Sequence, residues 1–235
     1  MSAYKKYIPF CLFVCAAVIT GAILLSRITS VASMQVSAAS AAPTIVIDAG
    51  HGGEDGGAVS VTGLRESQLN LEISLRLNDL LHFLGINTKM IRTEDISVYT
   101  QGESIAQKKV SDIHERVRLV EETPNALLLS IHQNHFSQSK YRGAQVFYGH
   151  GSQELAEAIQ STIVNHLDPN NHRECKPASD IYLLEHIHCP AALVECGFLS
   201  NPVEELLLRD ETYQKKLAAA VACGVIQYME AANEV

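Results

Sequence analysis

The chain has 235 residues, of which 47% are hydrophobic and 19% are charged, so it can bury a core and is not a disordered chain. Its 18 lysines and arginines stand against 26 aspartates and glutamates, a formal net charge of −8. This balance argues against a general nucleic-acid binder, which needs a basic face. Ten histidines in this length raise the question of a metal site.

An apolar segment lies near the start of the chain. Residues 7–25 carry no charge, and in a helix they reach roughly 28 Å, close to the thickness of a bilayer core. Lys5 and Lys6 precede the segment, which by the positive-inside rule predicts a cytoplasmic N-terminus and an exported body. The length favours an uncleaved anchor. A cleaved signal peptide with a small-residue site at 39–41 is the alternative.

This pattern divides the chain into three parts. We predict a membrane anchor or signal segment at 1–28, a Ser/Ala-rich linker at 29–43 and one folded domain at 44–235. The protein is therefore expected to be exported, either anchored in the membrane or secreted. The four cysteines of the folded domain show no CxxC spacing, so they predict no zinc site of their own, and a single disulfide stays unassigned.

Short apolar runs alternate with helical periodicity from residue 44 onward. Strands are expected at 44–48, 86–92, 126–131, 144–148 and 191–194. Helices are expected at 69–84, 111–122, 152–167 and 217–228, with a further helix starting at Asn201-Pro202, and residues 93–110 are expected to form a loop. This alternation predicts an α/β fold with one sheet flanked by helices.

Polar residues follow three of the predicted strands. His51 follows the first strand, His132 follows the strand at 126–131, and Glu195 follows the strand at 191–194. Glu66 lies at the approach to the first helix. If these strands are parallel neighbours, the four side chains converge beyond their carboxyl ends. Two histidines and one carboxylate suit a catalytic zinc with an open position, and Glu195 is placed to act as the base.

These residues lie in four motifs that resemble a known family. Residues 45–53 (IVIDAGHGG), Glu66, residues 130–134 (SIHQN) and residues 194–202 (VECGFLSNP) are similar to the zinc-dependent N-acetylmuramoyl-L-alanine amidases of type 3. The resemblance implies a twisted, mainly parallel sheet flanked by helices on both faces, with 44–235 as the catalytic domain. It makes His51, Glu66 and His132 ligands of one zinc ion and Glu195 the catalytic carboxylate.

The resemblance also implies a substrate. The family cleaves the amide between the lactyl group of N-acetylmuramic acid and L-Ala of the peptidoglycan stem peptide. Arg65 and Arg173 are candidates to bind the carboxylates of that peptide, since arginine forms bidentate pairs with carboxylates. Gln133 and Cys196 depart from the usual family pattern, but neither departure removes a ligand.

The layout of an apolar segment, a linker and one domain resembles the spore-cortex and germination-specific amidases. It implies a role in cortex maturation, where a partner deacetylase completes muramic-δ-lactam, and a location facing the cell wall or the forespore intermembrane space. Three alternatives stay open: a general cell-wall amidase, a weakly active wall-binding domain that needs an activator protein, and a zinc carboxypeptidase.

Other polar residues receive weaker predictions. Asp48 either orients His51 or caps the end of its strand. His135 and the histidines of residues 185–188 are expected to lie at the surface and bind no metal.

Overall fold

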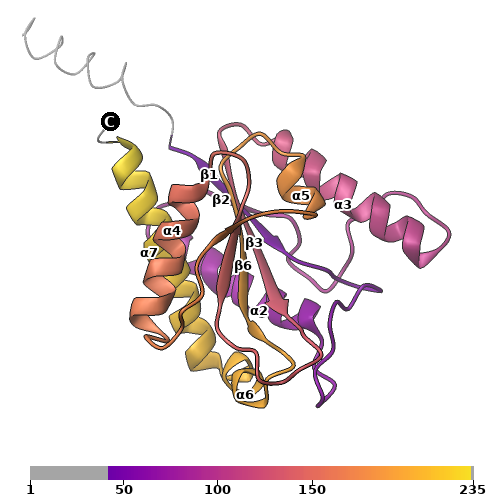
Figure 1. The fold of residues 1–235 in the computed structure, drawn as a ribbon. Coiled ribbons are helices and arrows are strands. Elements are labelled where there is room, and N and C mark those ends of the chain that lie inside the picture. The colour runs from indigo at the N-terminus through magenta and orange to yellow at the C-terminus, as the bar shows by residue number, and fades with distance from the viewer. Residues whose placement is uncertain (1–41, 234–235) are drawn as a thin grey trace, which may run out of the picture. The chain divides into compact units, whose positions relative to one another are not determined.

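The computed structural model describes residues 42–233, and at their centre is a six-stranded sheet (Figure 1). The strand order is β2-β1-β3-β6-β4-β5. The first four strands are parallel neighbours, β4 is antiparallel to β6, and β5 is parallel to β4. The strands are β1 (Thr44–Ala49), β2 (Thr88–Met90), β3 (Ala126–Asn134), β4 (Gln145–Tyr148), β5 (Lys176–Pro177) and β6 (Ala191–Phe198).

Helices cover both faces of the sheet. One face carries α2 (Glu66–Phe83), α4 (Gln153–His166), α6 (Pro202–Arg209) and α7 (Glu211–Asn233). The other face carries α3 (Ile105–Glu121) and the short α5 (Tyr182–Glu185). Figure 1 shows α4 and α7 on one side of the strands and α3 and α5 on the other. The predicted α/β fold with a mainly parallel, mixed sheet is thus confirmed.

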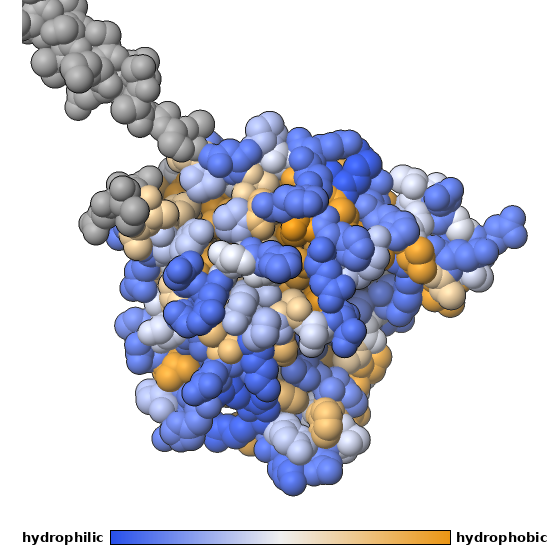
Figure 2. Space-filling model, turned by 45° about the horizontal axis from the view of Figure 1, so that its top comes forward, coloured by the Kyte–Doolittle hydropathy of each residue, from blue (hydrophilic) through white to orange (hydrophobic). Residues whose placement is uncertain are grey.

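The central strands are buried on both faces, which explains why they read as continuous apolar runs. Ile45 and Ile47 of β1 pack toward α2, α4 and α7, whereas Val46 between them packs toward α3 and α5. Side chains alternate across a strand, so Asp48 points to the same side of the sheet as Val46. The outer surface is mostly hydrophilic on the face seen in Figure 2, with apolar residues scattered among polar ones.

Several element boundaries differ from the predictions; α7, for example, begins at Glu211 instead of residue 217, and three further differences bear on the predicted loop and on the site residues. Helix α3 begins at Ile105, inside the segment predicted to be a loop, because Ser104 and Gln107 form a capping box that starts the helix early. Strands β3 and β6 run on through His132 and Glu195, so these residues lie within the strands instead of after them. The predicted start of α6 is confirmed, since Asn201 caps it by accepting hydrogen bonds from two backbone N–H groups.

The predicted anchor at 1–28 and nearly all of the predicted linker lie outside the described residues. From residue 42 to residue 233, no helix is both long and apolar enough to cross a bilayer. The four cysteines in the same part of the chain, Cys175, Cys189, Cys196 and Cys223, are all free thiols.

Candidate metal centre

The carboxyl ends of the parallel strands bring the predicted polar residues together. His132 of β3 lies in register with Glu195 of β6, and β1, which leads to His51, pairs with β3 on its other side. His51, His132 and Glu195 line one pocket of about 340 Å³, which is also bordered by α3 and α5. Glu66, the first residue of α2, reaches this site from the opposite face of the sheet.

His51, Glu66 and His132 offer ligand atoms that all lie within 4.8 Å of one another. Glu66 Oε1 lies 3.3 Å from His51 Nε2 and 3.0 Å from His132 Nδ1. The Glu66 side chain is 5% exposed, whereas the two imidazoles are 26% and 21% exposed and face the pocket. Two imidazole nitrogens and one carboxylate oxygen with an open side fit the ligand set of a catalytic zinc site.

Electrostatics around the three side chains also suits a cation. Burial alone would raise the pKa of Glu66, but hydrogen bonds from His132 and His51 outweigh it and hold that pKa far below its ordinary value. Burial alone would lower the pKa of His51, yet Asp55 and Glu66 raise it to about 9. The metal-free site therefore holds a carboxylate and a protonated imidazole, and a cation that binds there replaces this proton.

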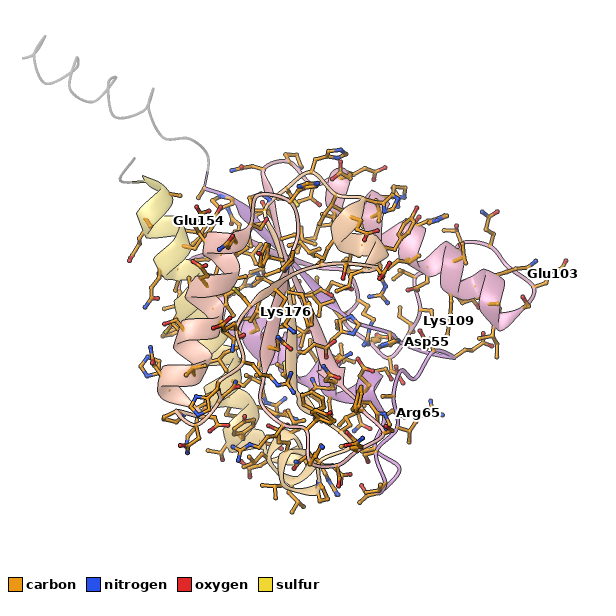
Figure 3. The ribbon with its side chains drawn as sticks, viewed as in Figure 1. Asp55, Arg65, Glu103, Lys109, Glu154 and Lys176 are labelled. Carbon is orange, nitrogen blue, oxygen red and sulfur yellow. The ribbon has the colours of Figure 1, made fainter. Side chains whose placement is uncertain are left out.

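Asp55 orients His51. Its Oδ2 accepts a hydrogen bond from His51 Nδ1 at 2.8 Å, which leaves Nε2 facing Glu66. Lys109 of α3 pairs with the other oxygen of Asp55 at 2.7 Å, and Figure 3 shows these two side chains close together. A carboxylate behind a histidine ligand fixes its tautomer and raises its basicity.

The orienting role considered for Asp48 is therefore wrong, because Asp48 has other partners. Its carboxylate accepts a hydrogen bond from Ser130 Oγ at 2.7 Å and forms a buried ion pair with Arg116 of α3. Burial would raise the pKa of Asp48, but the charge of Arg116 outweighs burial and lowers it. Asp48 thus ties β1 to β3 and α3 beneath the site.

Glu66 is held in place by hydrogen bonds in addition to those from the histidines. The backbone N–H groups of Ala58 and Gln133 donate to its carboxylate at 2.9 and 3.2 Å, and Asn70 Nδ2 donates at 3.3 Å. The Gln133 side chain in turn donates to Asn70 Oδ1 at 3.2 Å. Gln133, one of the two departures from the family pattern, therefore supports the carboxylate through Asn70.

Glu195 lies on the wall of the pocket and is not one of the three converging side chains. Its Oε2 is buried and has no hydrogen-bond partner among residues 42–233. Burial raises its pKa to about 7, and the negative charge of Glu66 adds to this effect, while His132 and His51 oppose it. A carboxyl group with a pKa near neutrality and a free oxygen is suited to exchange protons with a reactant.

The two arginines predicted to bind substrate have different surroundings. Arg65 is exposed, and within the described part of the chain its guanidinium has no hydrogen bond or ion pair; Figure 3 shows it on the same side of the molecule as Asp55. Arg173 donates to the carbonyl oxygen of Arg142 at 2.7 Å and to Gln145 Oε1 at 3.0 Å, and it stacks over Phe198. Among the described residues, the Arg65 guanidinium is therefore free to pair with a carboxylate, whereas that of Arg173 is already engaged.

No second metal cluster is found in the described residues. His51, Glu66 and His132 form the one group of histidine, cysteine, aspartate and glutamate side chains that converges there, so His135 and residues 185–188 contribute none. His188 instead pairs with Glu121 at the surface. Sequence reasoning missed Asp55, although a carboxylate four residues after His51 in a glycine-rich turn was a readable signal.

Replacing Gly50 with alanine is expected to displace His132 and weaken metal binding by about 10- to 100-fold, by analogy with the loss of other groups that support ligands. A Cβ at Gly50 would lie 2.2 Å from His132 Nε2, so the ring must move. Zinc affinity measured by chelator competition checks this. Gly197→Ala is the matched control, because the atoms nearest to its added methyl group, Leu208 Cδ1 at 3.3 Å and Glu204 Oε2 at 3.5 Å, belong to no metal-ligand candidate. Unchanged affinity in Gly50→Ala would contradict the geometry.

Comparisons with known proteins identify the family of the chain. The sequence profile of the N-acetylmuramoyl-L-alanine amidase family matches residues 45–227. The germination-specific N-acetylmuramoyl-L-alanine amidase of Bacillus subtilis is 36% identical over 189 residues, which cover 78% of each chain. The CwlD amidase of Clostridioides difficile, solved in complex with the GerS lipoprotein, is 40% identical with a TM-score of 0.78, over 80% of this chain and 99% of that one.

A second solved structure shows the same similarity. The N-acetylmuramoyl-L-alanine amidase of Clostridium difficile 630 is 32% identical with a TM-score of 0.69, over 81% of this chain and 98% of that one. The family match spans most of the sequence, and these relatives are matched over most of their own length. The chain therefore belongs to the N-acetylmuramoyl-L-alanine amidase family of cell-wall hydrolases.

Proposed function

We propose that this amidase uses one zinc ion, held by His51, Glu66 and His132, to hydrolyse the amide between the lactyl group of N-acetylmuramic acid and L-Ala of the stem peptide. The observation that carries the proposal is the convergence of these three side chains beside a pocket that also contains Glu195. Zinc bound there supplies positive charge that lowers the pKa of water and polarises the scissile carbonyl.

The residues of the chain around the zinc ion have separate roles in this reaction. Glu195 takes the proton of the attacking water and passes it to the L-Ala nitrogen as the amide bond breaks, so one carboxyl group serves as base and then as acid. Its unpaired oxygen and its pKa of about 7 in the metal-free protein suit both steps. Asp55 holds the His51 ring with Nε2 toward the site, and Asn70 and two backbone N–H groups hold the Glu66 carboxylate in place.

Mass spectrometry of peptidoglycan digested by the full-length protein in detergent tests this reaction. Digestion with zinc should release whole stem peptides that begin with L-Ala, and a chelator should stop the release. Release of single terminal amino acids would instead identify a carboxypeptidase. Binding without cleavage, in protein that contains zinc, would favour a wall-binding domain that depends on an activator.

We further propose a role in the spore cortex. The proposal is supported by the similarity to a germination-specific amidase and to an amidase solved with a lipoprotein partner. The chain would remove stem peptides so that a deacetylase completes muramic-δ-lactam, and a lipoprotein is the class of activator to seek. A deletion strain should lack δ-lactam in its cortex muropeptides. Unchanged δ-lactam would point to a general cell-wall amidase.

The location is part of the same proposal. The apolar segment at 7–25 would anchor the protein so that the catalytic domain faces the wall or the forespore intermembrane space. The N-terminal sequence of the protein isolated from cells tests the anchor. A mature protein that begins near residue 42 would show that the segment is a cleaved signal peptide.

The rate is expected to fall in acid as Glu195 becomes protonated. A base must be ionised to accept a proton, so kcat/KM should rise as the pH rises through the pKa of Glu195. Burial places that pKa at about 7 in the metal-free protein, against an ordinary value of 4.5, and a bound cation shifts it back toward the ordinary value. The acid limb should therefore have its midpoint between these two values. A rate that does not change across this range would contradict the assignment.

A further inference from the structure

Arg92, two residues after β2, is a buried cation with an unusual set of partners. It is 2% exposed, and within residues 42–233 it forms no ion pair. Its four hydrogen bonds all go to backbone carbonyl oxygens: Nε donates to Ala49 at 2.7 Å, Nη1 to Glu94 at 2.9 Å, and Nη2 to Gly50 at 3.0 Å and to Ser67 at 2.8 Å. A buried charge without a charged partner is costly, so this arrangement calls for an explanation.

Two of the four carbonyls belong to residues that adjoin metal-ligand candidates. Gly50 directly precedes His51, and Ser67 directly follows Glu66. Nη2 donates to both carbonyls while Nε of the same planar group donates to Ala49, so the guanidinium joins the end of β1 and the loop after it to the first turn of α2. Because the guanidinium is planar and rigid, it fixes how far apart these two segments lie.

The loop that carries His51 needs such support. His51 has a φ of 60°, a left-handed conformation that is strained for a residue with a side chain. Arg116 also holds this loop, since its Nη2 donates to the His51 carbonyl at 2.8 Å. Arg116, however, is paired with Asp48 and Asp112, so its burial has an ordinary explanation that Arg92 lacks.

The packing of α2 does not require Arg92. Leu69, Ile73 and Leu77 of this helix are buried against the sheet and anchor it through apolar contacts. What the apolar contacts do not fix is the position of the polar loop at 50–53 relative to the start of the helix. The contacts of Arg92 with the carbonyls of Ala49, Gly50 and Ser67 act at that point.

We propose that Arg92 is a positioning residue that sets the spacing between the ligand atoms of His51 and Glu66, and through it the zinc affinity of the site. The inference rests on the proposed zinc function of these residues. Lysine keeps the charge but donates from a single point, so it cannot span the carbonyls of Ala49 and Ser67 together.

The test compares Arg92→Lys with Arg76→Lys in the full-length protein. Arg76, in the middle of α2, also donates to a backbone carbonyl, that of Glu72, but lies away from the metal pocket. Zinc affinity from chelator competition should fall by about 10- to 100-fold in Arg92→Lys and stay within about twofold of wild type in Arg76→Lys. The visible spectrum of the cobalt-substituted Arg92→Lys protein should also change, because it reports ligand geometry.

The outcomes separate this inference from the function on which it rests. If wild type binds no zinc, the zinc proposal fails and this inference fails with it. If wild type binds zinc and Arg92→Lys matches its affinity and cobalt spectrum, only the role of Arg92 is overturned. Circular dichroism of the metal-free proteins checks folding, and Arg92→Gln is the second variant if Arg92→Lys does not fold. If neither variant folds, Arg92 supports the fold instead of the site, and the inference is overturned.

Discussion

Replacing Glu195 with glutamine is expected to lower kcat by about 10²- to 10⁴-fold, the usual contribution of a general acid–base group, while the protein still binds one zinc ion. Glutamine has nearly the same shape but cannot take up the water proton or return it to the leaving nitrogen. Because Glu195 is not among the three converging side chains, its replacement removes no ligand. Stem-peptide release and zinc content, measured on the same sample, check both halves of the expectation.

Glu154→Gln is the control for this change. Glu154 is an exposed residue in the first turn of α4, and Figure 3 shows it far from Asp55 and the metal pocket. Its replacement should leave the rate and the zinc content unchanged. A Glu195→Gln enzyme with full activity would contradict the base assignment. Loss of zinc together with activity would show that Glu195 acts on the metal site itself.

The convergence of His51, His132 and Glu195 could be predicted from sequence because it follows from strand direction. Each residue stands at the end of a strongly apolar run, and buried apolar strands that alternate with helices are typically parallel. Their carboxyl ends then meet at one edge of the sheet. Glu66 was harder to place, since a long turn separates it from His51. Its place at the approach to the first helix made it a candidate, and the resemblance to the family supported its assignment as a ligand.

The groups that support the ligands could not be predicted in the same way. Arg92 and Arg116 act through backbone carbonyls of residues distant in sequence, and no periodicity marks such contacts. Asp55 lies only four residues after His51, so it was a local signal that sequence reasoning missed. The early start of α3 was different. Ser104 and Gln107 have the spacing of a capping box, a local signal that outweighed the polar character of residues 93–110.

Removing zinc is expected to abolish activity without unfolding the protein, and adding one equivalent should restore it. Glu66 Oε1 lies within 3.3 Å of a nitrogen of each imidazole, so these contacts among the side chains can hold them together without a cation. The core beneath them is apolar and does not depend on the metal. Zinc at about 100 times its Kd should nevertheless stabilise the folded state by about 2.7 kcal/mol, because the unfolded chain has no assembled site.

His51→Ala tests whether His51 is needed for zinc binding or for the stability of the fold. The variant keeps Glu66 and His132 in contact but leaves two ligands where a catalytic zinc site needs three, so zinc binding and activity should be lost together. Its melting temperature without zinc should stay close to that of metal-free wild type, since the His51 side chain is partly exposed, but added zinc should no longer raise it. If chelator-treated protein shown by elemental analysis to contain no zinc still releases stem peptides at the wild-type rate, the metal has no part in the reaction. The converging side chains would then be a buried ion cluster that Asp55 and the arginines stabilise for the sake of the fold.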